Sequence, residues 1–174
     1  MRILALSGSL RAVSSNTALL EAVRLLAPGI EVRVYRGLGD LPHFNPDLDG
    51  DPALPPVAAF RAALQAADGV LVSCPEYAHG VPGMFKNALD WVVASGEFVD
   101  KPVALLNASP RATHAQAALT EILTVMTARL VPAASIDVPL LGRAWDPAQI
   151  AEDPELAPRL QTMLADFAEA VACA

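Results

Sequence analysis

The chain has 174 residues, of which 53% are hydrophobic, and it carries a formal net charge of -7. This length suits one domain with a substantial core, so we expect residues 1–174 to form a single domain. An acidic surface repels a phosphate backbone, which argues against nucleic acid as a partner. No apolar run reaches the length of a membrane span and no signal-peptide pattern is visible, so we expect no membrane insertion and a cytoplasmic location.

The predicted elements alternate between strands and helices along the chain. An apolar strand over 2–6 ends at a serine-rich turn, and apolar residues at helical spacing then predict a helix over 16–26. A long loop rich in turn residues follows the second strand. The other predicted strands are 30–35, 69–74, 103–107 and 135–138. The other predicted helices are 57–67, 83–95, 116–130 and 158–172.

This alternation predicts an α/β fold with a five-stranded parallel sheet covered by helices on both faces. Right-handed crossovers then give a three-layer sandwich, for which we expect the strand order 2-1-3-4-5. Ligands of such sheets bind beyond the carboxyl ends of the strands, where the strand order reverses. The loops after the first, third and fourth predicted strands are therefore the candidate site.

The first of these loops, at 7–17, has the composition of a phosphate site. It places hydroxyls, an amide and the guanidinium of Arg11 at the start of a helix, where backbone N–H groups and the helix dipole favour an anion. Ordinary helix capping is the alternative, but a cap needs only one such side chain. The loop lacks the glycines and the lysine of a P-loop, and it lacks the three glycines of a dinucleotide fingerprint. It also lacks the GxSxG sequence of a nucleophile elbow. A monophosphate such as FMN is therefore the favoured ligand. The residues assigned to this site are Ser9, Arg11, Ser14, Ser15, Asn16 and Thr17.

The second loop reads PEYAHGVPG and leads into the helix predicted from residue 83. Its glycines permit a turn whose backbone closely approaches a flat ring, along which Tyr77 could lie. The alternative is that Pro82 and Gly83 only start the helix. The third loop contains Ser109, Arg111 and His114, and a polar surface loop explains it about as well as a ligand site.

The sequence gives little support for a metal site, a reactive thiol or a catalytic ion pair. Cys74 and Cys173 form neither a CxxC pair nor a zinc spacing, and no metal site is predicted. Cys74 ends an apolar strand and is interpreted as a small buried hydrophobe. Lys86 and Asp90 have the spacing of a surface ion pair on a helix. We interpret Trp91 as a packing residue or a subunit contact.

Two motifs resemble the NADPH-dependent FMN reductase family of flavodoxin-like proteins, which includes quinone, azo-dye and chromate reductases. They read GSLRAVSSN at 8–16 and PEYAHGVPGMFKNALDW at 75–91. The resemblance implies that the first motif binds the FMN phosphate and that Ser109 lies near the flavin ring. It also implies that one turn holds the isoalloxazine, and this turn consists of Pro75, Glu76, Tyr77, Ala78, His79 and Gly80. Ala78 stands where the family motif has asparagine.

The resemblance implies an oxidoreductase that uses NADPH or NADH as donor and passes reducing equivalents through FMN to a small acceptor by a ping-pong mechanism. The acceptor would be a quinone, free flavin, azo compound or metal oxyanion. No side chain is expected to act as acid or base, because the flavin carries the hydride chemistry. Members of the family usually form homodimers or homotetramers. The alternatives are a flavodoxin-like electron carrier and a redox-responsive FMN-binding protein without NAD(P)H turnover.

Overall fold

The computed structural model describes residues 1–140 and 142–173. The strands are β1 (Arg2–Ser7), β2 (Glu31–Tyr35), β3 (Gly69–Ser73), β4 (Pro102–Asn107), β5 (Arg129–Leu130) and β6 (Ile136–Asp137). The α-helices are α1 (Ser15–Leu25), α2 (Pro55–Gln65), α3 (Gly83–Asp90), α4 (Thr113–Val125), α5 (Pro147–Glu152) and α6 (Leu156–Ala172). Short 3-10 turns lie at Gly37–Asp40, Pro46–Leu48 and Pro132–Ala134.

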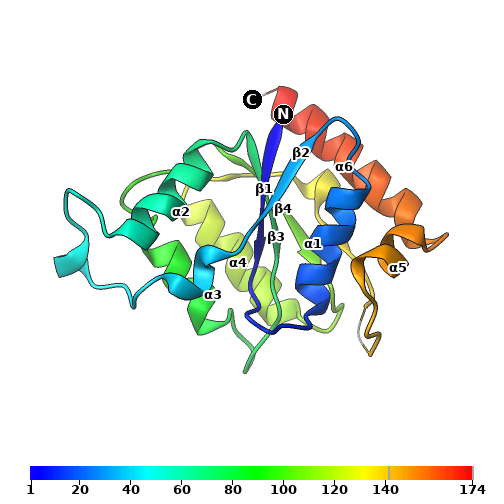
Figure 1. The fold of residues 1–174 in the computed structure, drawn as a ribbon, viewed down its shortest axis with the longest axis horizontal. Coiled ribbons are helices and arrows are strands. Elements are labelled where there is room, and N and C mark those ends of the chain that lie inside the picture. The colour runs from blue at the N-terminus through cyan, green and yellow to red at the C-terminus, as the bar shows by residue number, and fades with distance from the viewer. Residues whose placement is uncertain (141, 174) are drawn as a thin grey trace.

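The sheet is parallel and has the strand order β2-β1-β3-β4-β5, with β6 paired to β4. This is the flavodoxin-like order, and it confirms the predicted topology. In Figure 1 the sheet stands between two layers of helices, with α1, α5 and α6 on one side and α2, α3 and α4 on the other. Both termini lie at the opposite end of the molecule from the loop that joins β1 to α1.

Every residue of β3 and β4 is buried, so both faces of the central sheet are covered. Each face therefore packs against its own hydrophobic core. Phe60, Phe85 and Leu123 belong to the cluster on the side of α2, α3 and α4. Leu19 and Phe167 belong to the cluster beneath α1 and α6. Burying an aliphatic or aromatic side chain of this kind stabilises the fold by about 1.5–3 kcal/mol. The result is a rigid sheet whose carboxyl ends carry the loops of interest.

The edge of the sheet beyond β4 differs from the prediction. The helix predicted over 116–130 ends at Val125, since Thr127 adopts a left-handed φ of 58° that breaks the helical path. Arg129–Leu130 then pairs with the start of β4, and Pro132 begins a 3-10 turn. The strand predicted over 135–138 is the two-residue β6, which pairs with the end of β4. Two short segments therefore occupy the place of one fifth strand.

Two helices also differ from the prediction. The helix predicted over 83–95 is α3, which ends at Asp90 and continues as turns. Helix α5 was not predicted, although its capping box of Asp146 and Gln149 is a recognisable start signal. Trp91 is a packing residue, with an exposed fraction of 1% and an Nε1 that donates to the Pro42 carbonyl oxygen at 2.7 Å. The predicted ion pair between Lys86 and Asp90 is present.

Candidate flavin site

The first and second candidate loops begin side by side because β1 and β3 are neighbours in register. Ser7 of β1 is paired with Ser73 of β3, and the Gly8 amide donates to the Ser73 carbonyl oxygen at 2.9 Å. A Cβ atom on Gly8 would lie 2.3 Å from the Cys74 Sγ. The absence of a side chain at position 8 therefore lets the two loops touch.

Side chains within the first loop hold it in a fixed shape. The Ser14 hydroxyl accepts from the Thr17 amide and caps α1, as the capping alternative predicted. The Thr17 and Ser7 hydroxyls are 2.8 Å apart, and the Ser73 hydroxyl donates to the Asn16 Oδ1 at 2.9 Å. Two donors of the predicted set stay available, because the Asn16 Nδ2 and the Ser14 hydroxyl proton have no acceptor among the described residues.

Cys74 is packed rather than reactive. Its exposed fraction is 1%, and burial raises the pKa of the thiol to about 12. At neutral pH the thiol is therefore protonated, and the thiolate needed for nucleophilic or metal chemistry is scarce. The interpretation of Cys74 as a small buried hydrophobe is confirmed.

The second loop folds into a two-residue hairpin. The amide and carbonyl groups of Tyr77 and Gly80 pair with each other at 3.0 Å in both directions. Ala78 and His79 occupy the turn with φ values of 50° and 57°, a left-handed pair typical of a type I′ turn. The side chain of Tyr77 remains 51% exposed at the edge of this hairpin.

Two contacts join the second loop to the start of α4, which follows the third loop. The Glu76 Oε2 accepts from the Ala115 amide at 2.9 Å, so this carboxylate satisfies a free N–H in the first turn of the helix. The rings of His79 and His114 stack with centroids 4.3 Å apart and an interplanar angle of 15°. Both histidines therefore help to fix the hairpin against α4.

A cavity of about 440 Å³ lies between the three loops. It contains six of the predicted site residues, namely Arg11, Ser15, Asn16, Pro75, Glu76 and Ser109. Its other lining residues are Cys74, Ala108, Arg111, Ala112 and Gly142. Ser9, Tyr77, Ala78, His79 and Gly80 line neither this cavity nor the one described next. The contribution of Gly142 had no signal in the sequence, because Gly142 reaches the site only through the packing of α5 on α1.

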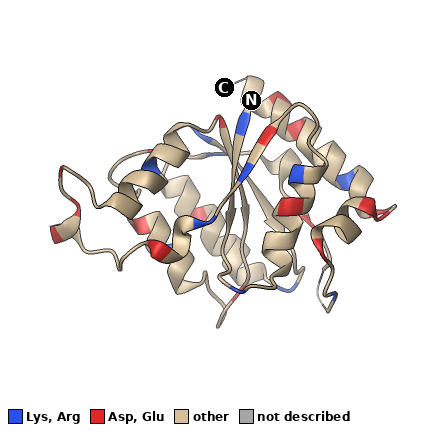
Figure 2. Ribbon diagram, in the orientation of Figure 1, with Lys and Arg blue, Asp and Glu red and all other residues tan. Residues whose placement is uncertain are grey.

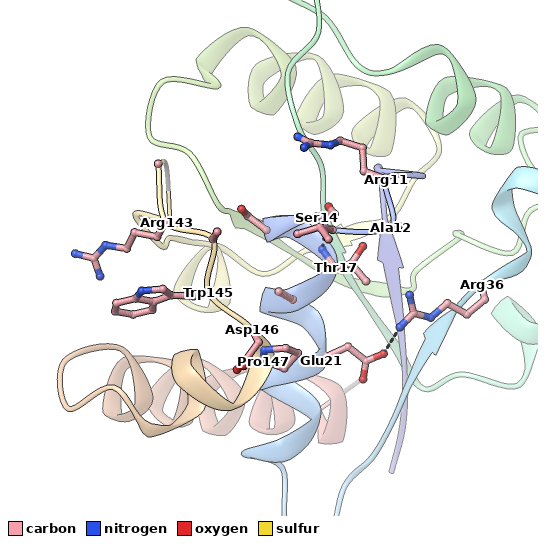
Figure 3. Close-up of a pocket in the computed structure, with 15 residues that line it drawn as sticks. Arg11, Ala12, Ser14, Thr17, Glu21, Arg36, Arg143, Trp145, Asp146 and Pro147 are labelled. Atoms are coloured by element: carbon pink, nitrogen blue, oxygen red, sulfur yellow. Dashed lines mark hydrogen bonds and ion pairs between the residues drawn. The ribbon is translucent and has the colours of Figure 1, made fainter.

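A second cavity, of about 500 Å³, begins at Arg11 and Ser15 and continues along α1. It includes Ser14 and Thr17 of the predicted set, and its far wall is the loop that precedes α5. Figure 3 shows this loop beside the first turns of α1, with Arg11 above them. The two cavities share Arg11, Ser15 and Gly142, so they adjoin at the first loop.

The donors around Arg11 fit the phosphate of FMN. Within the described part of the chain, neither the Arg11 nor the Arg111 guanidinium donates to another residue, so both are free for an anion. The single carboxylate in the smaller cavity is Glu76, and one of its oxygens is occupied by Ala115. Figure 2 shows basic residues on the loops at this end of the sheet, and both basic and acidic residues elsewhere in the molecule. A volume of 440 Å³ falls within the usual range of about 300–1,000 Å³ for small-molecule sites.

Two further features are absent from residues 1–140 and 142–173. No group of three or more His, Cys, Asp or Glu side chains there could hold a metal ion. None of the helices in the same residues has the length and apolar character that a membrane crossing requires.

The fold is that of a flavodoxin-like protein, and the smaller cavity lies between the loops that follow β1, β3 and β4. Residues 1–139 match the family model for NADPH-dependent FMN reductases, and the chain belongs to that family.

Relatives and a solved structure agree with this membership. The chain is 39% identical to a probable NADPH:quinone oxidoreductase of Oryza sativa over 63% of its length and 38% identical to an NAD(P)H-dependent FMN reductase of Pseudomonas aeruginosa over 63%. The matched regions span 56% and 60% of those two relatives. The structure of FerB, a flavoenzyme NAD(P)H:(acceptor) oxidoreductase from Paracoccus denitrificans, aligns with a TM-score of 0.80 and 30% identity, covering 98% of this chain and 97% of FerB.

Proposed function

We propose that this chain is an FMN-dependent oxidoreductase that uses NADPH or NADH to reduce a small acceptor. The acceptor class is a quinone, free flavin, azo compound or metal oxyanion. The observation that carries the proposal is the cavity lined by the free Arg11 guanidinium, by Ser15 and Asn16 at the start of α1, and by Pro75 and Glu76 just before the hairpin, in a chain of this family. When bound, FMN supplies the hydride chemistry, and the protein contributes binding, orientation and electrostatics.

The first loop would hold the phosphate. Arg11 would supply a charged donor, and Ser15, which lines both cavities with it, would supply a hydroxyl. Ser9, which lines neither cavity, is kept as a proposed donor from the same loop. Ser14, Asn16 and Thr17 keep the loop in place through the contacts described above, and Ser14 and Asn16 retain one donor group each. A preorganised set of donors loses little conformational entropy on binding, which favours tight binding of the phosphate.

The 75–80 hairpin would present its backbone to the flavin ring. Its Tyr77 and Gly80 amides are consumed by the hairpin itself. In the residues that the structure describes, the amides of Glu76, Ala78 and His79 have no backbone acceptor and so remain available as donors. Such N–H groups beside a flavin stabilise the negative charge that develops on reduction. Ser109 lines the smaller cavity and would face the same ligand.

The chemistry requires no acid or base from the protein, and the cavity offers none that is specialised for it. Its one carboxylate, on Glu76, is engaged with α4. The neighbouring Leu10, Val13 and Tyr77 are at least half exposed, so acceptors would stack on an open, largely apolar surface. We therefore expect the enzyme to discriminate weakly between acceptors, because few hydrogen bonds would distinguish one acceptor from another.

Donor and acceptor would use the same open face in turn, which gives ping-pong kinetics. Initial rates measured at several fixed quinone concentrations should give parallel double-reciprocal plots against NADPH. Intersecting lines would contradict the shared face, and absence of turnover with either nucleotide would contradict the enzyme itself. We also propose that the protein is a homodimer or homotetramer and that it is cytoplasmic. Sedimentation of the FMN-loaded protein measures the oligomeric state.

A further inference from the structure

A buried serine ends β3, at a position where the preceding residues on the same face of the sheet are apolar. Leu71, two residues earlier, faces the core beneath α1, and in β1 Ile3 and Ala5 face the same core. Alternate residues of a strand point to the same face, so Ser73 also points toward α1. Its exposed fraction is 0%, and a hydroxyl is costly at such a position unless it is hydrogen-bonded. Packing alone would be satisfied by alanine, so the partner of this hydroxyl decides its role.

The Ser73 hydroxyl has its partner in the first turn of α1. It donates to the Asn16 Oδ1 at 2.9 Å. Asn16 is itself buried, with an exposed fraction of 9%, yet it lines the cavity between the three loops. One end of the amide is therefore held against the sheet. The other end, the Nδ2, has no acceptor in the described part of the chain and is free to face the cavity.

The contact with Ser73 fixes which end of the Asn16 amide faces the cavity. An asparagine side chain offers an acceptor at one end and two donor hydrogens at the other, and the two ends have nearly the same shape. In the reversed orientation the Nδ2 would donate to the Ser73 oxygen, and the Ser73 proton would lose the acceptor that it has in this structure. A buried hydroxyl proton without an acceptor is unfavourable. The Ser73 proton therefore selects the orientation that directs the Nδ2 toward the cavity.

We propose that Ser73 is a positioning residue for the FMN phosphate: its hydroxyl orients the Asn16 amide so that an N–H group, and not a carbonyl oxygen, meets the anion. An N–H group donates to a phosphate oxygen, whereas a carbonyl oxygen at the same place would repel it. The inference rests on the proposed FMN site, because that site assigns Asn16 to the phosphate. Ser73 lines neither cavity and acts only through Asn16.

A purely structural role of Ser73 would give a different result on substitution. If the hydroxyl only fastened α1 to the sheet, its loss would weaken every ligand of the site alike. If it orients the amide, its loss weakens only ligands that carry the phosphate. FMN and riboflavin separate the two roles, because they share the flavin ring and the ribityl chain and differ in the phosphate.

The test is fluorescence titration of the apoprotein with FMN and with riboflavin in Ser73→Ala, in Asn16→Ala and in the double variant. Ser135→Ala is the matched control, because it also removes a serine hydroxyl that bonds within the sheet, to the Leu105 amide, but lines neither cavity. Urea unfolding of each apoprotein measures how far the substitution loosens the fold.

The Kd of FMN should rise about five- to tenfold in Ser73→Ala, because a bound phosphate would then hold the buried Asn16 Oδ1 where it has lost its donor. The Kd of riboflavin should stay unchanged, and so should both Kd values in Ser135→Ala. In the Asn16→Ala background, Ser73→Ala should have no further effect on FMN, since the amide that it orients is gone.

Three results would overturn the inference: an unchanged FMN affinity in Ser73→Ala, an equal loss for FMN and riboflavin, or additive losses in the double variant. Each of these can occur in a protein that binds FMN and turns over, so the proposed function would survive them. If the wild-type protein binds no FMN, the proposed function fails first and the inference with it.

Discussion

Replacing Arg11 by alanine should weaken FMN binding without harming the fold. The Arg11 side chain is exposed and donates to no other residue in the described part of the chain, so its removal leaves no buried group unpaired. Its guanidinium borders both cavities at the start of α1. A phosphate at that position would lose one charge-assisted contact.

The magnitude follows from the nature of that contact. A hydrogen bond to a charged group contributes about 1.5–3 kcal/mol, and each 1.4 kcal/mol changes the Kd about tenfold. The Kd of FMN should therefore rise by about 10- to 150-fold in Arg11→Ala. The lower part of this range is expected, because the loop is open to solvent and water screens an exposed ion pair.

The assay is fluorescence titration of the apoprotein with FMN and, separately, with riboflavin, which has the same ring but no phosphate. Arg11→Ala should weaken FMN and leave riboflavin unaffected. Arg111→Ala is the variant to compare with Arg11→Ala, because it also removes a guanidinium that lines the smaller cavity, but one that belongs to the third loop. An unchanged FMN affinity in Arg11→Ala, or an equal loss for both ligands, would refute the phosphate assignment.

Three further predictions concern the frame of the site. Gly8→Ala should destabilise the protein by about 1–3 kcal/mol in urea unfolding, because the new Cβ would lie 2.3 Å from the Cys74 Sγ; an unchanged midpoint would show that the loops separate easily. Ala78→Asn should raise stability by about 0.5–1 kcal/mol, since asparagine tolerates a φ of 50° better than alanine; a loss would contradict the turn geometry. Iodoacetamide at pH 8 should label the exposed Cys173 and spare Cys74, whose pKa is about 12; labelling of Cys74 in the folded protein would refute its burial.

The positions of the candidate loops that are local in the chain could be predicted from the sequence. The loop at 7–17 and the hairpin at 75–80 each follow a strongly apolar strand, so their position at one end of a parallel sheet could be predicted. The individual roles were less predictable. Ser14, Asn16 and Thr17 were assigned to the ligand, and the structure shows that they also bond to Thr17, Ser73 and Ser7.

Features that depend on distant packing could not be predicted. Helix periodicity continued through 126–130, and a left-handed Thr127 that ends the helix has no signature in a single sequence. Gly142 enters the site only because α5 packs on α1, which brings residues from the far end of the chain to the first loop. The stacking of His79 on His114 likewise joins two loops whose distance along the sequence gives no indication of contact.

The most direct test of the central claim is an anaerobic spectrum of the FMN-loaded protein as NADPH, and then NADH, is added. Reductase function predicts rapid loss of the flavin absorbance near about 450 nm and its recovery when a quinone is added. Bound flavin that neither nucleotide bleaches would contradict the proposed function and would favour an electron carrier or a redox-responsive binding protein.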